Sequence, residues 1–190
     1  VITEITLRMI EGMILELTRG GAIDLTEEEH LEILKRKTAY LFYGCAQMGA
    51  MLGKVSPEVA NALGEYGMNI GMAFQVADDL LDFTSDEKIL GKPVLSDLKE
   101  GHVTLPIIYA LKEEPRALPT VQSVLDRRDI DDVSRMEILD LVRRNRCLDK
   151  ARLLAEDYAR RAKQCLEVVP DSRHKDALSS LTHYVIDRNR

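Results

Sequence analysis

No proline interrupts the chain between Pro57 and Pro93, and apolar residues recur there at intervals of three and four. This spacing is typical of an α-helix that buries one face. Ser56 followed by Pro57 is a strong helix-start signal, because serine caps the first turn and proline is tolerated within it. The sequence therefore predicts one long helix from this cap to about Phe83, and the fold has to be built around a rod of that length.

Three carboxylates stand within the apolar run near the end of this predicted helix, at Asp78, Asp79 and Asp82. Asp78 and Asp82 are one turn apart and Asp79 lies about 100° around the axis, so we expect all three to converge on one groove. Like charges at this spacing destabilise a helix, and a counter-charge is required. Magnesium fits, since it is held by one or two carboxylates together with the phosphates of a substrate. A solvated helix face or an acidic first turn is the alternative.

The rest of the sequence also predicts helices, because period-two alternation is not sustained in it. We expect an all-α fold without a sheet, organised as a single domain over residues 1–190. A first helix should end near Gly20-Gly21. Thr26 to Glu29 forms a capping-box pattern for the next helix, which is expected to carry Lys37 and Thr38.

Gly64, Gly67 and Gly71 lie on one side of the predicted long helix. Each glycine costs a helix interior roughly 1 kcal/mol relative to alanine, so something should compensate. Close packing against another helix is the favoured explanation. Space cleared for a ligand tail is the alternative, and the two are compatible.

The composition is that of an ordinary soluble protein, with 45% hydrophobic and 31% charged residues and a formal net charge of -6. The negative charge argues against a nucleic-acid partner, and arginine pairs such as Arg127-Arg128 are interleaved with acids. Cys45, Cys147 and Cys165 are odd in number and lack metal-ligand spacing, which favours buried, reduced thiols in the cytoplasm. No apolar run reaches the length of a membrane span, and the first residues show no signal peptide.

A second group of distinctive residues surrounds the aspartate motif. In chain order these are Arg36-Lys37-Thr38, Phe74-Gln75, the aspartates, Gly91-Lys92, Asp97-Leu98-Lys99-Glu100-Gly101 and Thr104-Leu105-Pro106. This order resembles the second aspartate-rich region of the trans-isoprenyl diphosphate synthases, the polyprenyl synthetase family, and specifically its long-chain, octaprenyl-like members. The resemblance runs from near Glu11 to the last residue.

The resemblance also reveals a difference. Members of this family carry an earlier aspartate-rich motif, and no second DDxxD pattern occurs in this sequence. The chain opens on Val1, inside a predicted amphipathic helix. We therefore expect it to be the C-terminal portion of a longer polyprenyl synthetase domain. It would form a partial isoprenoid-synthase-type helical bundle that lacks the N-terminal helices and is inactive alone.

The resemblance implies a magnesium-dependent prenyltransferase of isoprenoid biosynthesis, which joins isopentenyl diphosphate head to tail with an allylic diphosphate. Negative charge builds up on the leaving diphosphate, where metal ions and cationic side chains can stabilise it. The implied metal ligands are Asp78, Asp79 and Asp82, with Asp97 in the outer shell. The implied substrate-binding residues are Lys37, Thr38, Gln75, Lys92 and His102, and the implied catalytic residues are Lys37, Thr38, Gln75 and Asp78. The resemblance also implies a cytoplasmic homodimer, and we expect no nucleic-acid partner and no transmembrane segment.

Each implied role has a simpler alternative. Lys37 and Lys92 would supply positive charge to the diphosphate, but a lysine like Lys37 is commonly a surface residue. Thr38 and Gln75 present oxygen dipoles that would stabilise an allylic cation. The Thr38 hydroxyl could instead bond to its own helix, and Gln75 could be a buried amide with local partners. Asp97 is either a helix N-cap or an outer-shell partner of the metal.

Two positions depart from the family pattern. Family members commonly have lysine where this chain has His102, so diphosphate binding should be weaker or more dependent on pH, because histidine titrates near neutrality. The segment Gly12-Met13-Ile14-Leu15-Glu16 replaces a more usual Gly-Glu followed by Gln. The resemblance therefore assigns no role to that segment.

Two other functions are compatible with parts of the sequence. A non-catalytic partner subunit of a heteromeric synthase would keep the fold, but the intact second motif argues against it. A class I terpene cyclase would share the helical bundle, but its second metal motif typically has Asn, Ser or Thr and Glu. Product length depends in this family on residues before the first motif, which are not in this sequence.

Overall fold

The computed structural model describes residues 1–84 and 94–187, so Lys92 lies outside the described residues. Helices dominate both ranges and neither contains a strand, which confirms the predicted all-α class. The elements are α1 (Ile2–Arg19), α2 (Glu27–Leu34), the π-helical turn η1 (Lys35–Ala39), α3 (Tyr40–Gly53), α4 (Pro57–Thr84), α6 (Ser96–Glu100), α7 (Leu105–Glu113), the 3-10 turn η2 (Pro115–Ala117), α8 (Leu118–Arg127), α9 (Asp132–Arg144), α10 (Cys147–Cys165) and α11 (Arg173–Asp187).

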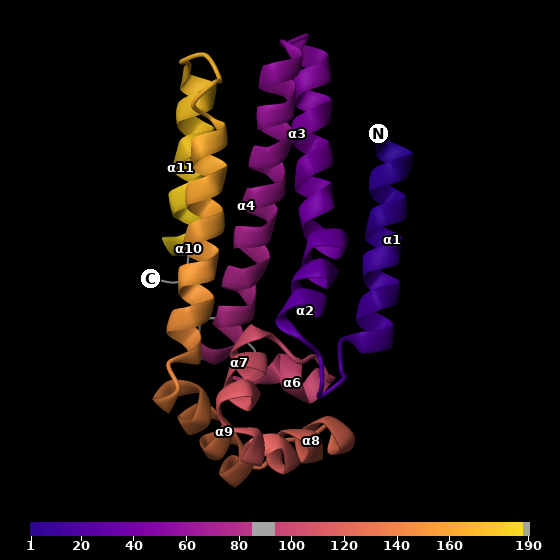
Figure 1. Cartoon of the computed structure of the whole chain (residues 1–190), viewed down its shortest axis with the longest axis vertical. Coiled ribbons are helices and arrows are strands. Elements are labelled where there is room, and N and C mark those ends of the chain that lie inside the picture. Colours follow the sequence, from indigo (N-terminus) through magenta and orange to yellow (C-terminus); the bar gives the residue numbers. More distant parts are fainter. Residues whose placement is uncertain (85–93, 188–190) are drawn as a thin grey trace.

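The long helices lie side by side along the long axis of the molecule (Figure 1). Helix α3 packs between α1 and α4, and α10 packs on α4 and α11. The shorter helices α6 to α9 gather at one end of this row, beneath the C-terminal end of α4 (Figure 1). The predicted long helix is confirmed as α4, and the Ser56 hydroxyl accepts a hydrogen bond from the Val59 N–H at 3.3 Å at its start.

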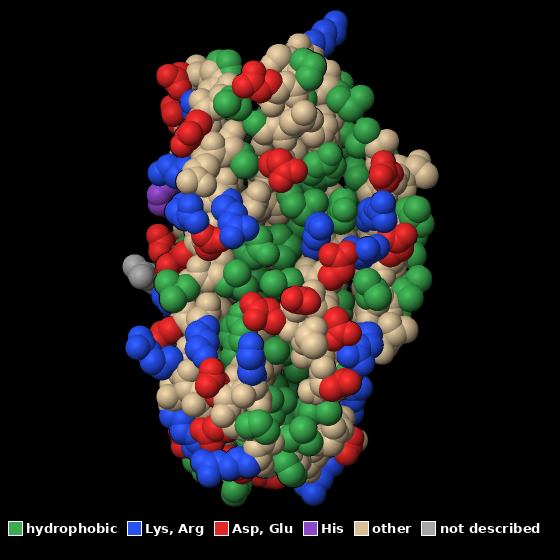
Figure 2. Space-filling model, in the orientation of Figure 1, with side chains coloured by type: hydrophobic (Ala, Val, Ile, Leu, Met, Phe, Trp, Pro, Cys, Tyr) green, Lys and Arg blue, Asp and Glu red, His purple; other side chains and the backbone are tan. Residues whose placement is uncertain are grey.

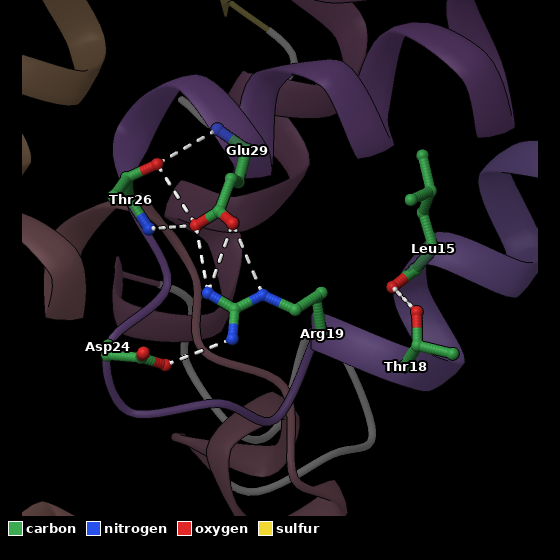
Figure 3. A network of polar contacts seen from close by, with 6 residues as sticks. All are labelled: Leu15, Thr18, Arg19, Asp24, Thr26 and Glu29. Atoms are coloured by element: carbon green, nitrogen blue, oxygen red, sulfur yellow. Dashed lines mark hydrogen bonds and ion pairs between the residues drawn. The ribbon is translucent and has the colours of Figure 1, made fainter.

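The start of α2 is fixed by the predicted capping box. Thr26 Oγ1 accepts a bond from the Glu29 N–H at 3.2 Å, and Glu29 Oε2 accepts one from the Thr26 N–H at 2.9 Å. Arg19, the last residue of α1, donates to both carboxylate oxygens of Glu29 and to Asp24 (Figure 3). The bond from Thr26 and those from Arg19 lower the pKa of Glu29 to about 2. The turn between α1 and α2 is therefore held at both ends.

The glycines of α4 pack against α3 and the end of η1. A Cβ atom on Gly67 would lie 2.5 Å from the Phe42 carbonyl oxygen, and one on Gly71 would lie 2.7 Å from Ala39 Cα. Real Cβ contacts are essentially never that short, so the backbone of α4 touches the backbone of α3 and η1 only because both positions lack a side chain. Close helix packing, the favoured explanation of these glycines, is confirmed.

The opposite side of α4 packs on α10. Ala151, Ala155 and Ala162 of α10 are at most 1% exposed, and their small size lets the two helices approach closely.

The expectation of buried thiols holds for Cys147, whereas Cys45 is exposed and Cys165 intermediate. That expectation was wrong for Cys45 because burial depends on which helix face a residue occupies, and the cysteine count carries no information on the face.

Large apolar side chains remain exposed on α1. Leu7, Ile10, Met13, Ile14 and Leu17 are between 48% and 85% exposed, and their spacing places them along one stripe of the helix. Figure 2 shows further apolar side chains between the charged ones on the visible face of the molecule. Among the described residues, every helix is too short or too polar to cross a membrane.

Candidate functional site

A cavity of about 210 Å³ lies where the C-terminal half of α4 meets α1, α2, η1 and α6. Residues far apart in the sequence form its wall. Those predicted from the sequence are Lys37, Gln75, Asp78, Asp79, Asp97 and His102, and those not predicted include Glu16, His30, Glu100 and Thr104.

Asp78 and Asp79 both line this cavity, as expected, but their environments differ. Asp78 is exposed, whereas Asp79 is only 4% exposed and its Oδ2 lies 2.7 Å from His30 Nε2. His30 is 6% exposed, so this contact is a buried tie between α2 and α4. A buried carboxylate needs such a partner, because an unpaired one would lose its hydration without compensation.

Asp82 does not line the cavity, so the expectation that three carboxylates converge on one groove is wrong for this residue. Its carboxylate accepts bonds from the Ser96 N–H and hydroxyl, each at 2.9 Å, and from the Asp97 N–H at 3.3 Å. These donors lie at the start of α6, where backbone N–H groups lack partners within the helix. Burial raises the pKa of Asp82, while the three hydrogen bonds act in the opposite direction. Asp82 therefore anchors α6 to α4.

Asp97 does not cap α6, because Leu95 occupies the N-cap position and the Asp97 side chain lies in the first turn. Burial, together with the charges of Asp82, Asp79 and Asp78, raises the pKa of Asp97 to about 7. The aspartates thus form a cluster whose negative charges are close enough to perturb one another. Such a cluster is suited to a cation.

Lys37 extends from η1 into the cavity and contacts a residue of α1. Its Nζ lies 2.7 Å from Glu16 Oε1, and His102 Nδ1 lies 3.9 Å from the same oxygen. The Lys37 and His102 side chains are 41% and 43% exposed, and that of Glu16 is 22% exposed. A carboxylate therefore lies between the two basic side chains.

Thr38 and Gln75 contact each other. The Thr38 hydroxyl donates to Gln75 Oε1 at 3.0 Å and joins η1 to α4. The alternative of a hydroxyl bonded to its own helix is therefore not observed for Thr38. Gln75 lines the cavity, whereas Thr38 stands behind it.

Lys37 and Thr38 lie in a π-helical turn instead of the α-helix that the sequence predicts. Such turns insert one residue into a helix and are frequent at functional sites. Helix α1 crosses this turn at Gly12, where a Cβ atom would lie 2.4 Å from the Lys37 nitrogen. The absence of a side chain at Gly12 allows α1 to rest directly on the backbone that carries Lys37.

The donor set of the cavity fits a hard cation that is shared with a ligand. Among the residues that the structure describes, no three His, Cys, Asp or Glu side chains are arranged to hold a metal ion without other ligands. Magnesium is commonly bound by one or two carboxylates, with water and substrate phosphates completing six oxygens. Asp78 and Asp79, the two aspartates of α4 that line the cavity, satisfy that requirement, and a closed cage does not form.

Two cavity residues that contact predicted site residues, His30 and Glu16, were not predicted from the sequence. His30 gave no signal, because its partner Asp79 lies 49 positions later and only the fold brings them together. Glu16 was visible as a departure from the family pattern, but its contact with Lys37 depends on how α1 crosses η1.

Fold and cavity together define an all-α isoprenoid-synthase bundle, and solved structures agree. A polyprenyl synthase from Caulobacter crescentus, complexed with calcium and isoprenyl diphosphate, superimposes with a TM-score of 0.91 at 32% identity, covering 100% of this chain and 58% of that one. Heptaprenyl diphosphate synthase from Staphylococcus aureus gives 0.90 at 33% identity, covering 100% and 59%.

The chain belongs to the polyprenyl synthetase family, whose pattern matches residues 1–142. A prenyl transferase of Cyanophora paradoxa is 39% identical over 188 residues, which are 98% of this chain and 57% of that protein. Octaprenyl diphosphate synthase of Escherichia coli is 36% identical over 184 residues, which are 95% of this chain and 56% of that protein. The chain therefore spans little more than half the length of these relatives.

Proposed function

We propose that this chain is part of a polyprenyl diphosphate synthase, a prenyltransferase that condenses isopentenyl diphosphate with an allylic prenyl diphosphate. The observation that carries the proposal is the meeting of Asp78, Gln75 and Lys37, from α4 and η1, on one cavity. The reaction requires a cation-binding end for the diphosphate and neutral oxygen dipoles near the reacting carbon. These side chains supply both chemistries.

The charge of the cavity supports a role for divalent cations. Acidic side chains outnumber basic ones among the lining residues, so a bare diphosphate would meet net repulsion. Bound magnesium would neutralise the carboxylates and the charge that develops on the leaving pyrophosphate. We propose Asp78 and Asp79 as the metal-facing carboxylates, with Asp82 and Asp97 acting behind them.

The remaining predicted residues act on the organic substrates. Lys37, with His102 beside it, would bind the diphosphate through N–H donors. Lys92 keeps the same proposed role from the sequence. As the allylic carbon–oxygen bond breaks, its electron pair leaves with pyrophosphate. Gln75, held by Thr38, would then present its amide oxygen to the allylic cation, which the isopentenyl double bond attacks before a proton is lost.

We also propose that the whole protein is a cytoplasmic homodimer. The resemblance to the family implies the homodimer, and the exposed apolar stripe of α1 from Leu7 to Leu17 would be buried either in its interface or against the N-terminal helices expected in the longer domain. Sedimentation velocity on the full-length protein tests this part. A monomer at micromolar concentration would contradict it.

The proposed activity is tested with Asp78→Asn in the full-length protein. Turnover of labelled isopentenyl diphosphate with an allylic primer and magnesium should fall by roughly a hundredfold or more, because the side chain loses the charge that binds the cation. The melting temperature should change little, since Asp78 is exposed.

Asp140→Asn is the matched control, because Asp140 is an exposed aspartate of α9 that does not line the cavity. It should retain full turnover. Unchanged turnover in Asp78→Asn would reject the role of this residue. A wild-type protein that binds the substrates without turning them over would favour the non-catalytic partner subunit.

A further inference from the structure

Two parallel ion pairs join α1 to η1, and only one of them lies in the cavity. Glu11 Oε2 contacts Arg36 Nη1 at 2.5 Å, and Glu16 Oε1 contacts Lys37 Nζ at 2.7 Å. Glu16 and Lys37 line the cavity, whereas Glu11 and Arg36 do not. Both glutamates thus come from the same helix and pair with neighbouring residues of the same turn, but only the Glu16 carboxylate borders the space where a ligand would bind.

Glu16 is not the only residue that docks α1. Gly12 already seats α1 on the backbone of η1, and the pair of Glu11 and Arg36 holds the same two elements together. The contact between Glu16 and Lys37 therefore has another consequence, which concerns the cavity itself.

An anion beside Lys37 opposes the binding of a second anion. The Glu16 oxygen already accepts a bond from the ammonium group and also lies 3.9 Å from His102 Nδ1. A phosphate that reaches Lys37 must share the ammonium with this carboxylate and lie within a few ångströms of its negative charge. The ammonium has three donors and can bond to both, but the repulsion between the two anions remains.

We propose that Glu16 is an internal counter-ion that sets the affinity of this cavity for diphosphates, occupying Lys37 when the cavity is empty and weakening diphosphate binding when it is full. The inference rests on the proposed function and deepens it. Its consequence for the reaction is that pyrophosphate, once released from the allylic carbon, leaves the cavity more readily than the lysine would otherwise allow.

Glu16→Gln tests this inference, because glutamine keeps an oxygen that accepts a bond from Lys37 and removes the charge. The dissociation constant of inorganic pyrophosphate, measured by calorimetry on the full-length protein with and without magnesium, should fall by about tenfold. Glu16→Ala removes the same charge and serves if the glutamine variant does not fold.

Glu11→Gln is the matched control, since it breaks the parallel ion pair outside the cavity. It should leave the affinity for pyrophosphate within about twofold of wild type while loosening α1 to a similar extent. A purely structural role for Glu16 predicts the same outcome for both variants.

The outcomes separate the two proposals. Tighter binding in Glu16→Gln, with no gain in Glu11→Gln, supports the counter-ion role. If wild type binds pyrophosphate and Glu16→Gln binds it equally well or more weakly, the counter-ion role is overturned and the proposed function stands. No binding of pyrophosphate by wild type or variant in the presence of magnesium overturns the proposed function and this inference with it.

Discussion

The two halves of α4 are held in place by different forces. From Gly64 to Gly71 the helix is positioned by steric contact, because its backbone touches α3 or the end of η1 at each of its glycines. From Gln75 to Asp82 it is positioned by polar bonds to separate elements: Thr38 in η1, His30 in α2 and Ser96 in α6.

This difference bears on how a rigid scaffold supports a charged site. Steric contact does not depend on charge, so the glycine half keeps its position whatever binds at the other end. Polar bonds to carboxylates respond to protonation and to bound cations, so the aspartate half is the part that a ligand can adjust. The helix thus separates a fixed end from an adjustable one.

Disrupting the steric contact between Gly67 and α3 should cost the protein the most stability. Gly67→Ala should lower the free energy of unfolding by about 3 kcal/mol, because the new Cβ atom would lie 2.5 Å from the backbone oxygen of Phe42, which cannot rotate away. Urea denaturation measures the loss. Gly49→Ala is the control: a Cβ atom there meets nothing within 4 Å, so helix propensity should stabilise α3 by up to about 1 kcal/mol. Equal effects at both positions would contradict the steric account.

Removing the hydrogen bonds between Asp82 and α6 should lower the free energy of unfolding by a smaller amount. Asp82→Ala should cost about 2 kcal/mol, because it leaves the Ser96 N–H, the Ser96 hydroxyl and the Asp97 N–H without their acceptor. Amide hydrogen exchange should show faster opening of α6 than of α3. Asp82→Asn retains one acceptor oxygen and should recover part of the stability. Unchanged exchange in α6 would show that this tie does not anchor it.

The aspartate half should also make the stability of the protein depend on pH. The pKa of Asp97 is about 7 in the folded state against an ordinary value of 3.8, so the folded state binds more protons than the unfolded state between these values. Stability should therefore fall as pH rises from about 4 to 7. Asp97→Asn should remove much of this fall and gain about 1 kcal/mol at pH 8 without metal. Asp82, whose pKa is also raised, adds a slope of the same sign.

Thermal denaturation across pH 4 to 8 measures this slope in both proteins. A Gly67→Ala variant should keep the wild-type slope, since its effect is steric. If Asp97→Asn retains the full wild-type dependence, the aspartate cluster does not carry the repulsion assigned to it.

Much of the fold could be predicted from local signals. The cap at Ser56 and the absence of proline gave α4 nearly to its last residue, and the capping box gave the start of α2. The π-helical turn could not be predicted, because Lys35 to Ala39 have ordinary helix-forming composition. The contact that accompanies it, between Gly12 and the backbone of Lys37, joins two segments that meet only in the folded chain.

The site was predicted in part for a related reason. The motif identified Asp78, Asp79 and Asp82 by type and spacing, but helix geometry gives only the direction of a side chain and not its partner. The sequence therefore predicts Asp82 in the groove, whereas in the structure its carboxylate accepts a hydrogen bond from the Ser96 hydroxyl. His30 lies outside every recognisable pattern, and it became visible only through its distance from Asp79.

The π-helical turn also lets one continuous helical segment hold an extra residue. In an α-helix each residue advances about 100° around the axis, and the wider turn from Lys35 to Ala39 absorbs one additional residue, so α2 and α3 continue each other nearly in phase. His30 can therefore face Asp79 while the surface of α3 lies on the glycines of α4. A residue added or removed within α2 or α3 themselves would rotate one of these faces by about 100°, so these helices should tolerate substitution far better than a change of length.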